Sequence, residues 1–133
     1  MLKLSTDTAA PAVMSVMDAI YERRSVRSYL PKTVDRALVS NLLDAAVQAP
    51  TAVHEEPWAF AVVQDRATLR RLSDKALQLF QPAPVPQSYT LPENVFYDAG
   101  TLIVIYGKPL GPFVPADCWL AAENLMLAAR AMG

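Results

Sequence analysis

The chain has 133 residues, of which 53% are hydrophobic and 19% are charged, and its formal net charge is −1. This composition predicts one folded domain with a sizeable core and excludes a disordered chain. The near-zero charge provides no basic surface for nucleic acid, and no apolar run approaches the roughly 20 residues of a membrane span.

The cysteine content indicates a reducing compartment. Cys118 is the single cysteine, which excludes an internal disulfide. Residues 1–13 lack the continuous apolar stretch of a secretory signal. We therefore expect a cytoplasmic protein.

The chain begins with a segment that predicts a loose arm, Met1–Pro11. A short helix is predicted over Met14–Glu22, because Met17, Ile20 and Tyr21 recur at the i, i+3, i+4 spacing of one helix face.

A second helix is predicted after Pro31, which prevents the first helix from continuing. Thr33 is the expected cap of this second helix, and Pro50 ends it. Its apolar residues form two adjacent columns that predict a broad buried stripe. These are Leu38, Leu42 and Ala46, and Val39, Leu43 and Val47.

The run Trp58–Val63 shows no polar alternation, which predicts a strand covered on both faces. Asp65 can cap a helix from Arg66 to about Phe80. The residues expected to face inward on that helix are Leu69, Leu72, Ala76 and Leu79.

Residues 81–97 contain four prolines and predict a long loop, of the length that often covers a functional site. A second strand, buried on both faces, is predicted over Leu102–Tyr106, and a final helix over Ala116–Met132. Gly133 follows that helix, where a C-terminal cap glycine would lie.

The final helix is apolar nearly all round from Trp119 to Ala129, which is typical of a helix interior to something larger. Two strands alone make a poor sheet. We therefore expect either a partner chain over this helix or a domain that is incomplete at its C-terminus.

The segment from Arg23 to Tyr29 brings three arginines and two serines together in an otherwise apolar chain. Arginine forks match phosphate geometry, and a serine hydroxyl adds a short donor beside them. This pattern predicts an anion site. The alternative is the solvated basic end of a helix, where arginine favours the helix dipole.

Three stretches in this order resemble the FMN-dependent nitroreductase family: Arg-Arg-Ser-Val-Arg-x-Tyr, Ala-Pro-Thr-Ala-x-His-x-Glu-Pro-Trp and Leu-Ala-Ala-Glu-Asn-Leu-Met-Leu-Ala-Ala. The resemblance extends from about Met17 to the end of the chain. It implies an α+β fold, a three-layer α/β/α sandwich with a mixed, mainly antiparallel sheet, here truncated at the C-terminus. It also implies a homodimer with FMN bound between the subunits.

The resemblance further implies which residues hold FMN. Arg23, Arg24, Ser25 and Arg27 would bind the phosphate and the polar edge of the ring, and Pro50, Thr51, Ala52 and His54 would reach the flavin of the other subunit. NADH or NADPH would be the reductant, and a nitroaromatic, a quinone or a similar small molecule the electron acceptor. No catalytic side chain and no metal are required, because the flavin carries the hydride chemistry.

Two residues depart from the family pattern, which commonly has Asn at the position of His54 and Gln at that of Glu56. His54 can still form a hydrogen bond to the flavin, but it also titrates. Glu56 would disfavour an anionic reduced flavin if it lay near the ring. Three alternatives stay open: a flavin-modifying or dehalogenating relative, a flavin-binding module without turnover, and an interaction domain without cofactor.

Overall fold

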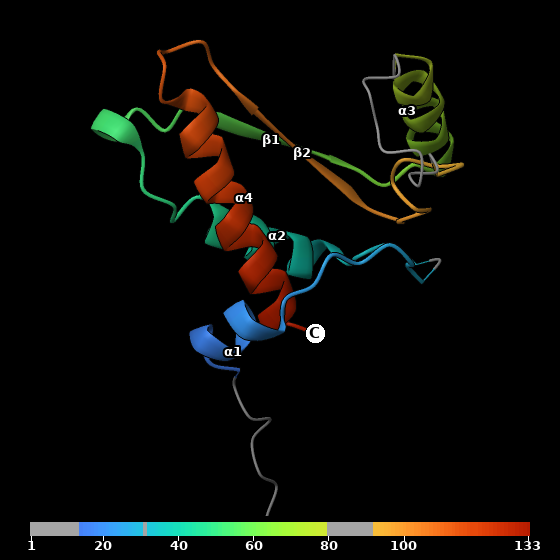
Figure 1. The fold of residues 1–133 in the computed structure, drawn as a ribbon, viewed down its shortest axis with the longest axis horizontal. Helices are drawn as coiled ribbons and strands as arrows, with labels where there is room; N and C mark the ends of the chain where they lie inside the picture. Colours follow the sequence, from blue (N-terminus) through green and yellow to red (C-terminus); the bar gives the residue numbers. More distant parts are fainter. Residues whose placement is uncertain (1–13, 31, 80–91) are drawn as a thin grey trace, which may run out of the picture.

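A computed structural model describes residues 14–30, 32–79 and 92–133. The predicted N-terminal arm, Pro31, and residues 80–91 of the predicted helix end and proline-rich loop lie outside these ranges. The described residues form four α-helices and one two-stranded sheet, and Figure 1 shows how they are arranged. In chain order the elements are α1 (Val16–Glu22), α2 (Arg36–Ala46), the short 3₁₀ helix η1 (Ala52–His54), β1 (Trp58–Val63), α3 (Arg66–Leu79), β2 (Leu102–Gly107) and α4 (Val114–Ala131).

Short polar side chains begin the first two helices. Ser15 Oγ accepts a hydrogen bond from the backbone N–H of Asp18 at α1, and Asp35 Oδ1 accepts one from that of Leu38 at α2. These bonds satisfy amides that have no partner within the helix. The expectation that Thr33 caps α2 was wrong, because Asp35 lies directly before the first helical residue and accepts the capping bond.

The apolar stripe of α2 is narrower than its two columns predicted. Val39, Leu42 and Ala46 are buried, whereas the side chain of Val47 is exposed. Val47 is the C-cap of α2, and its position at the end of the helix turns it away from the core.

Asp65 caps α3 as predicted, since its Oδ2 accepts a hydrogen bond from the backbone N–H of Thr68 at 2.8 Å. Leu69 and Ser73 are the buried residues of this helix. The expectation that Leu72 and Leu79 face inward was wrong, because both are exposed. Figure 1 explains this difference, since α3 stands at the far end of the sheet, away from α2 and α4.

The strands β1 and β2 pair antiparallel, from Trp58 opposite Gly107 to Val63 opposite Leu102. Trp58 is buried, but Val104 and Tyr106 are exposed. The expectation that both strands are covered on both faces is therefore wrong for this chain. The described helices that pack on the strand pair leave part of its surface uncovered.

The core lies where α2 and α4 cross beside the sheet (Figure 1). Ala46, Ala49 and Ala121 are fully or almost fully buried there, and Phe60 of β1 and Leu125 of α4 pack against them. Small side chains at a helix crossing allow the two backbones to approach closely, and the larger Phe60 packs against this cluster from β1. The described elements confirm the α+β class.

A polar cluster joins the opposite end of the strands to the segment before α2. Thr101 Oγ1 accepts hydrogen bonds from the backbone N–H of Val34 and from Gln64 Nε2, both at 3.0 Å. Gln64 Nε2 also donates to the carbonyl oxygen of Val34 at 2.6 Å. Gly100 packs beside this cluster, where an added Cβ would lie 2.2 Å from the carbonyl oxygen of Lys32. These contacts fix where the arginine segment rejoins the body of the domain.

Candidate functional site

The arginine segment leaves the end of α1 in a non-helical conformation and remains at the surface. Arg23 is the C-cap of α1. Arg24 Nη1 donates to the carbonyl oxygens of Tyr21 and Arg23, at 2.6 and 2.8 Å. The Arg24 side chain therefore acts as a basic group at the C-terminal end of a helix, which is the alternative to an anion site.

Arg27 lies in a different setting. With Ser28 and Tyr29 it lines a depression of about 310 Å³, whose other lining residues are Pro92, Glu93, Asn94, Tyr97 and Asp98. Arg27 and Ser25 are exposed. Among residues 14–30, 32–79 and 92–133, Arg27 forms no ion pair, although Glu93 and Asp98 line the same depression. A guanidinium in this state is available to an anionic ligand.

The second predicted segment forms a tight turn between α2 and β1. Val53, His54 and Glu56 all have positive φ angles, of 53°, 59° and 45°. For residues other than glycine such a conformation is uncommon, although Asn, Asp and His tolerate it better than most. The left-handed backbone is therefore compatible with His54, and it would be compatible with Asn at this position as well. Three such residues store strain on the order of 1–3 kcal/mol each.

Hydrogen bonds hold this turn at its start and just beyond its end. Asp117 Oδ1 of α4 accepts a hydrogen bond from the backbone N–H of Ala52 at 3.1 Å, and Lys108 donates its N–H to the carbonyl oxygen of Pro57 at 2.8 Å. Asp117 is 5% exposed and Pro57 is fully buried. Between them, Val53 and His54 are exposed to solvent.

Sequence reasoning missed Asp117. An acidic residue in the first turn of a helix is ordinary, because it interacts favourably with the helix dipole. The available signal was a single carboxylate within the otherwise apolar stretch Val114–Ala122 of α4, whose burial requires a donor from elsewhere in the fold.

The two candidate segments lie at opposite ends of α4 (Figure 1). Asp117 contacts the turn near the start of α4, and Arg130 forms an ion pair with Glu22, next to the arginine segment, near its end. A rise of about 1.5 Å per residue separates Asp117 from Arg130 by about 20 Å. Within one chain, the structure does not bring Arg23, Arg24, Ser25 and Arg27 together with Pro50, Thr51, Ala52 and His54.

Other side chains that could support chemistry are isolated. Burial raises the pKa of the Cys118 thiol, and the neighbouring Asp117 carboxylate raises it further, so the thiol remains protonated near neutral pH. In the part of the chain that the structure describes, no group of three or more His, Cys, Asp or Glu residues is arranged to hold a metal ion. None of the helices described has the length and apolar character needed to cross a membrane.

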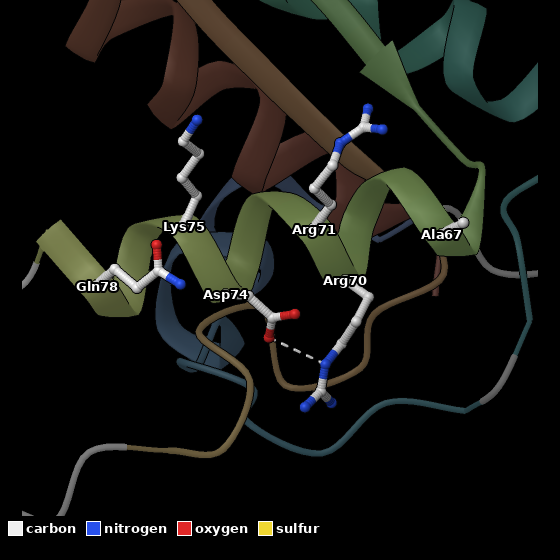
Figure 2. A pocket seen from close by; sticks show the side chains of 6 residues that line it. All are labelled: Ala67, Arg70, Arg71, Asp74, Lys75 and Gln78. Atoms are coloured by element: carbon white, nitrogen blue, oxygen red, sulfur yellow. Dashed lines mark hydrogen bonds and ion pairs between the residues drawn. The ribbon is translucent and has the colours of Figure 1, made fainter.

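A second depression, of about 450 Å³, lies along α3 (Figure 2). Arg70 and Asp74 form an ion pair at 3.1 Å on one side, and Arg71 and Lys75 extend on the other. Every residue that lines this depression belongs to the same helix. It is therefore a groove on a solvated helix surface and gathers no groups from different elements.

Comparisons with known proteins show which family the chain resembles. A family model described as "Nitroreductase family" matches residues 20–133. A protein of Archaeoglobus fulgidus named "Putative NADH dehydrogenase/NAD(P)H nitroreductase" is 34% identical over 119 residues, which cover 86% of this chain and 60% of that protein. Iodotyrosine deiodinase of Danio rerio is 38% identical over 52 residues, or 39% of this chain and 18% of that protein.

The fold of the chain is also similar to those of solved structures. A nitroreductase with bound FMN from Bacteroides fragilis superposes with a TM-score of 0.78 and 28% identity, covering 90% of this chain and 66% of that chain. This chain spans only about 60% of the length of the Archaeoglobus fulgidus protein. The family model covers most of the sequence, and the fold agrees with it, so the chain belongs to the nitroreductase family.

Proposed function

We propose that this chain binds FMN and forms part of an FMN-dependent oxidoreductase of the nitroreductase type. The exposed Arg27 guanidinium carries the proposal, because it forms no ion pair among the residues described and lies beside a depression. Ser25 supplies an exposed hydroxyl two residues earlier. The bound FMN of the Bacteroides fragilis nitroreductase supports this choice of ligand.

The residues of this segment suit different parts of FMN. Arg27 and Ser25 have donors at the surface and fit the phosphate or the polar edge of the ring. Arg23 lies close enough in sequence to join them. Arg24 already donates to two carbonyl oxygens, so its part in the site is mainly to shape the end of α1. A guanidinium near the ring would stabilise negative charge on the reduced cofactor.

The chemistry in this proposal belongs to the cofactor. When bound, FMN would supply hydride transfer, in alternating half-reactions, from NADH or NADPH to a nitroaromatic, a quinone or a similar small acceptor. The protein's own residues bind and orient, and no protein nucleophile or metal is required. The single cysteine fits a reducing compartment such as the cytoplasm.

We further propose that the site forms between two copies of the chain. The turn with Pro50, Thr51, Ala52 and His54 lies about 20 Å along α4 from the region of the arginine segment, which is longer than the flavin ring system. The turn of one subunit and the arginines of another can meet one flavin if α4 lies at a dimer interface. The exposed apolar side chains of α4, such as Trp119, support this interface.

The Arg27→Ala variant tests the cofactor assignment. Loss of a charge-assisted hydrogen bond of roughly 1.5–3 kcal/mol should raise the dissociation constant for FMN by about one to two orders of magnitude. Arg71→Ala is the matched control, since it removes an exposed arginine of α3 and the same unit of charge. Flavin fluorescence titration measures both variants. Equal dissociation constants for Arg27→Ala and the unmodified chain would contradict the assignment.

Reductive dehalogenation is a second candidate, favoured by the similarity to iodotyrosine deiodinase. The two activities are separated by their products. Oxidation of NADH or NADPH with a quinone supports the nitroreductase type, and release of iodide from iodotyrosine supports the alternative. A chain that binds FMN but does neither is a flavin-binding module, and a chain that binds no FMN is an interaction domain.

A further inference from the structure

We infer that Asp117 is a positioning residue, which holds the turn Thr51–Glu56 in the conformation that meets the flavin. The inference rests on the proposed function for its ligand and on the structure for its geometry. Asp117 lies on α4, 65 residues from Ala52 in sequence, and accepts the Ala52 N–H at 3.1 Å. The contact therefore joins the turn to a segment that is distant in the chain.

The turn needs an external restraint because its backbone is strained. Val53, His54 and Glu56 lie in the left-handed region, and Val53 is β-branched, which makes its φ of 53° a rare conformation. Strain of this kind persists only where the surroundings over-determine it. The backbone hydrogen bond across η1, from the Glu55 N–H to the carbonyl oxygen of Ala52, is long at 3.4 Å.

The restraint comes from groups on both sides of the turn. At its C-terminal side, Pro57 is fully buried, and its carbonyl oxygen accepts the Lys108 N–H as β1 begins. At its N-terminal side, the Asp117 carboxylate fixes Ala52. A buried carboxylate is a strong acceptor, and its burial is unfavourable without a donor, so the two groups stabilise each other.

This arrangement makes Asp117 the link between α4 and the exposed part of the turn. Val53 is 80% exposed and makes little contact that could orient its neighbours. Without the bond to Asp117, the turn can relax toward ordinary backbone angles, which would move Thr51 and His54 together. The expected consequence is a misplaced flavin contact in a domain that remains folded.

Three variants of the 133-residue chain test this role. Asp117→Ala removes the acceptor, whereas Asp117→Asn keeps an oxygen that can accept the Ala52 N–H. Asn124→Ala is the matched control, because Asn124 lies on the same helix and donates to the carbonyl oxygen of Ala45 at 3.2 Å, away from the turn. If Asp117→Ala does not fold, Asp117→Ser replaces it, since its hydroxyl ends one bond short of the carboxylate oxygen.

The measurements are the dissociation constant for FMN, the visible spectrum of the bound flavin, and hydrogen exchange at Ala52. We expect Asp117→Ala to raise the dissociation constant roughly tenfold, and Asp117→Asn and Asn124→Ala to stay within about threefold of the unmodified chain. Only Asp117→Ala should change the flavin spectrum and speed exchange at Ala52.

Two results would overturn the inference: an Asp117→Ala dissociation constant equal to that of the unmodified chain, or an equal loss in Asn124→Ala. The second would mean that Asp117 acts only through stability. Failure of the unmodified chain to bind FMN would instead refute the proposed function. Hydrogen exchange at Ala52 would then still test whether Asp117 holds the turn. Equal exchange rates in Asp117→Ala and the unmodified chain would argue against that role.

Discussion

Val53 has a left-handed backbone, which is unfavourable for a β-branched residue. Its side chain is 80% exposed, so burial of the side chain does not offset this strain. We predict that Val53→Gly stabilises the fold. The change relieves strain of roughly 1–3 kcal/mol and costs about 0.5–1 kcal/mol in glycine entropy. Thermal unfolding should show a higher Tm.

Val16→Gly is the control for this substitution. Val16 is also exposed, at 70%, but it begins helix α1, where glycine is unfavourable. Its Tm should fall. A Tm for Val53→Gly that falls as much as that of Val16→Gly would show that the turn is not strained at this residue.

At the scale of elements, α3 depends on its cap, because only Leu69 and Ser73 are buried on it. Hydrogen bonds from the side chain and the backbone of Thr68 lower the pKa of Asp65 from its ordinary value of 3.8. A lowered pKa means that the cap stabilises α3 above pH 3.8 and that this stabilisation is lost as the pH falls through the lower value.

We therefore predict that acid destabilises α3 through protonation of Asp65, and that Asp65→Asn removes this pH dependence. Asparagine caps a helix about as well as aspartate but does not titrate. Circular dichroism should show that, between about pH 4 and about pH 2, the native chain loses more helical signal than Asp65→Asn. Identical acid titrations of the two chains would contradict the assigned role of Asp65.

For the whole molecule, the decisive feature is the uncovered apolar surface of α4. Trp119, Leu120 and Met126 are 73%, 45% and 38% exposed, although they belong to one helix of the core. Patches of this kind mark interaction sites. We predict a homodimer with α4 at its interface, which sedimentation equilibrium should detect as twice the chain mass of 14.5 kDa.

The Trp119→Glu variant should dissociate this dimer and also abolish FMN binding, because the proposed site takes residues from two subunits. Leu79→Glu is the control, since Leu79 is also apolar and is 76% exposed but lies on α3. A soluble monomer of the unmodified chain at high micromolar concentration would exclude the α4 interface.

Local signals in the sequence predicted most elements because helix and strand formation depends on near neighbours. The cap at Asp65 and the hydrophobic run Trp58–Val63 each predicted the element that the structure contains. Thr33 was the wrong cap because Thr33 and Asp35 are both suitable capping residues. Only the position of the first helical residue, Arg36, shows that Asp35 is the cap.

The sequence by itself determined the helix and strand order and the arginine segment as a candidate anion site, and its resemblance to the nitroreductase family implied the α+β class. Periodicity, caps and residue chemistry are local properties, so one chain is enough to infer them. Only the tertiary structure decided that Asp117 meets Ala52, that Val53 and His54 adopt left-handed angles, and that the arginine segment and the turn lie at opposite ends of α4. These are contacts between distant segments, and they depend on how α2, α4 and the strands pack together, which no local pattern encodes.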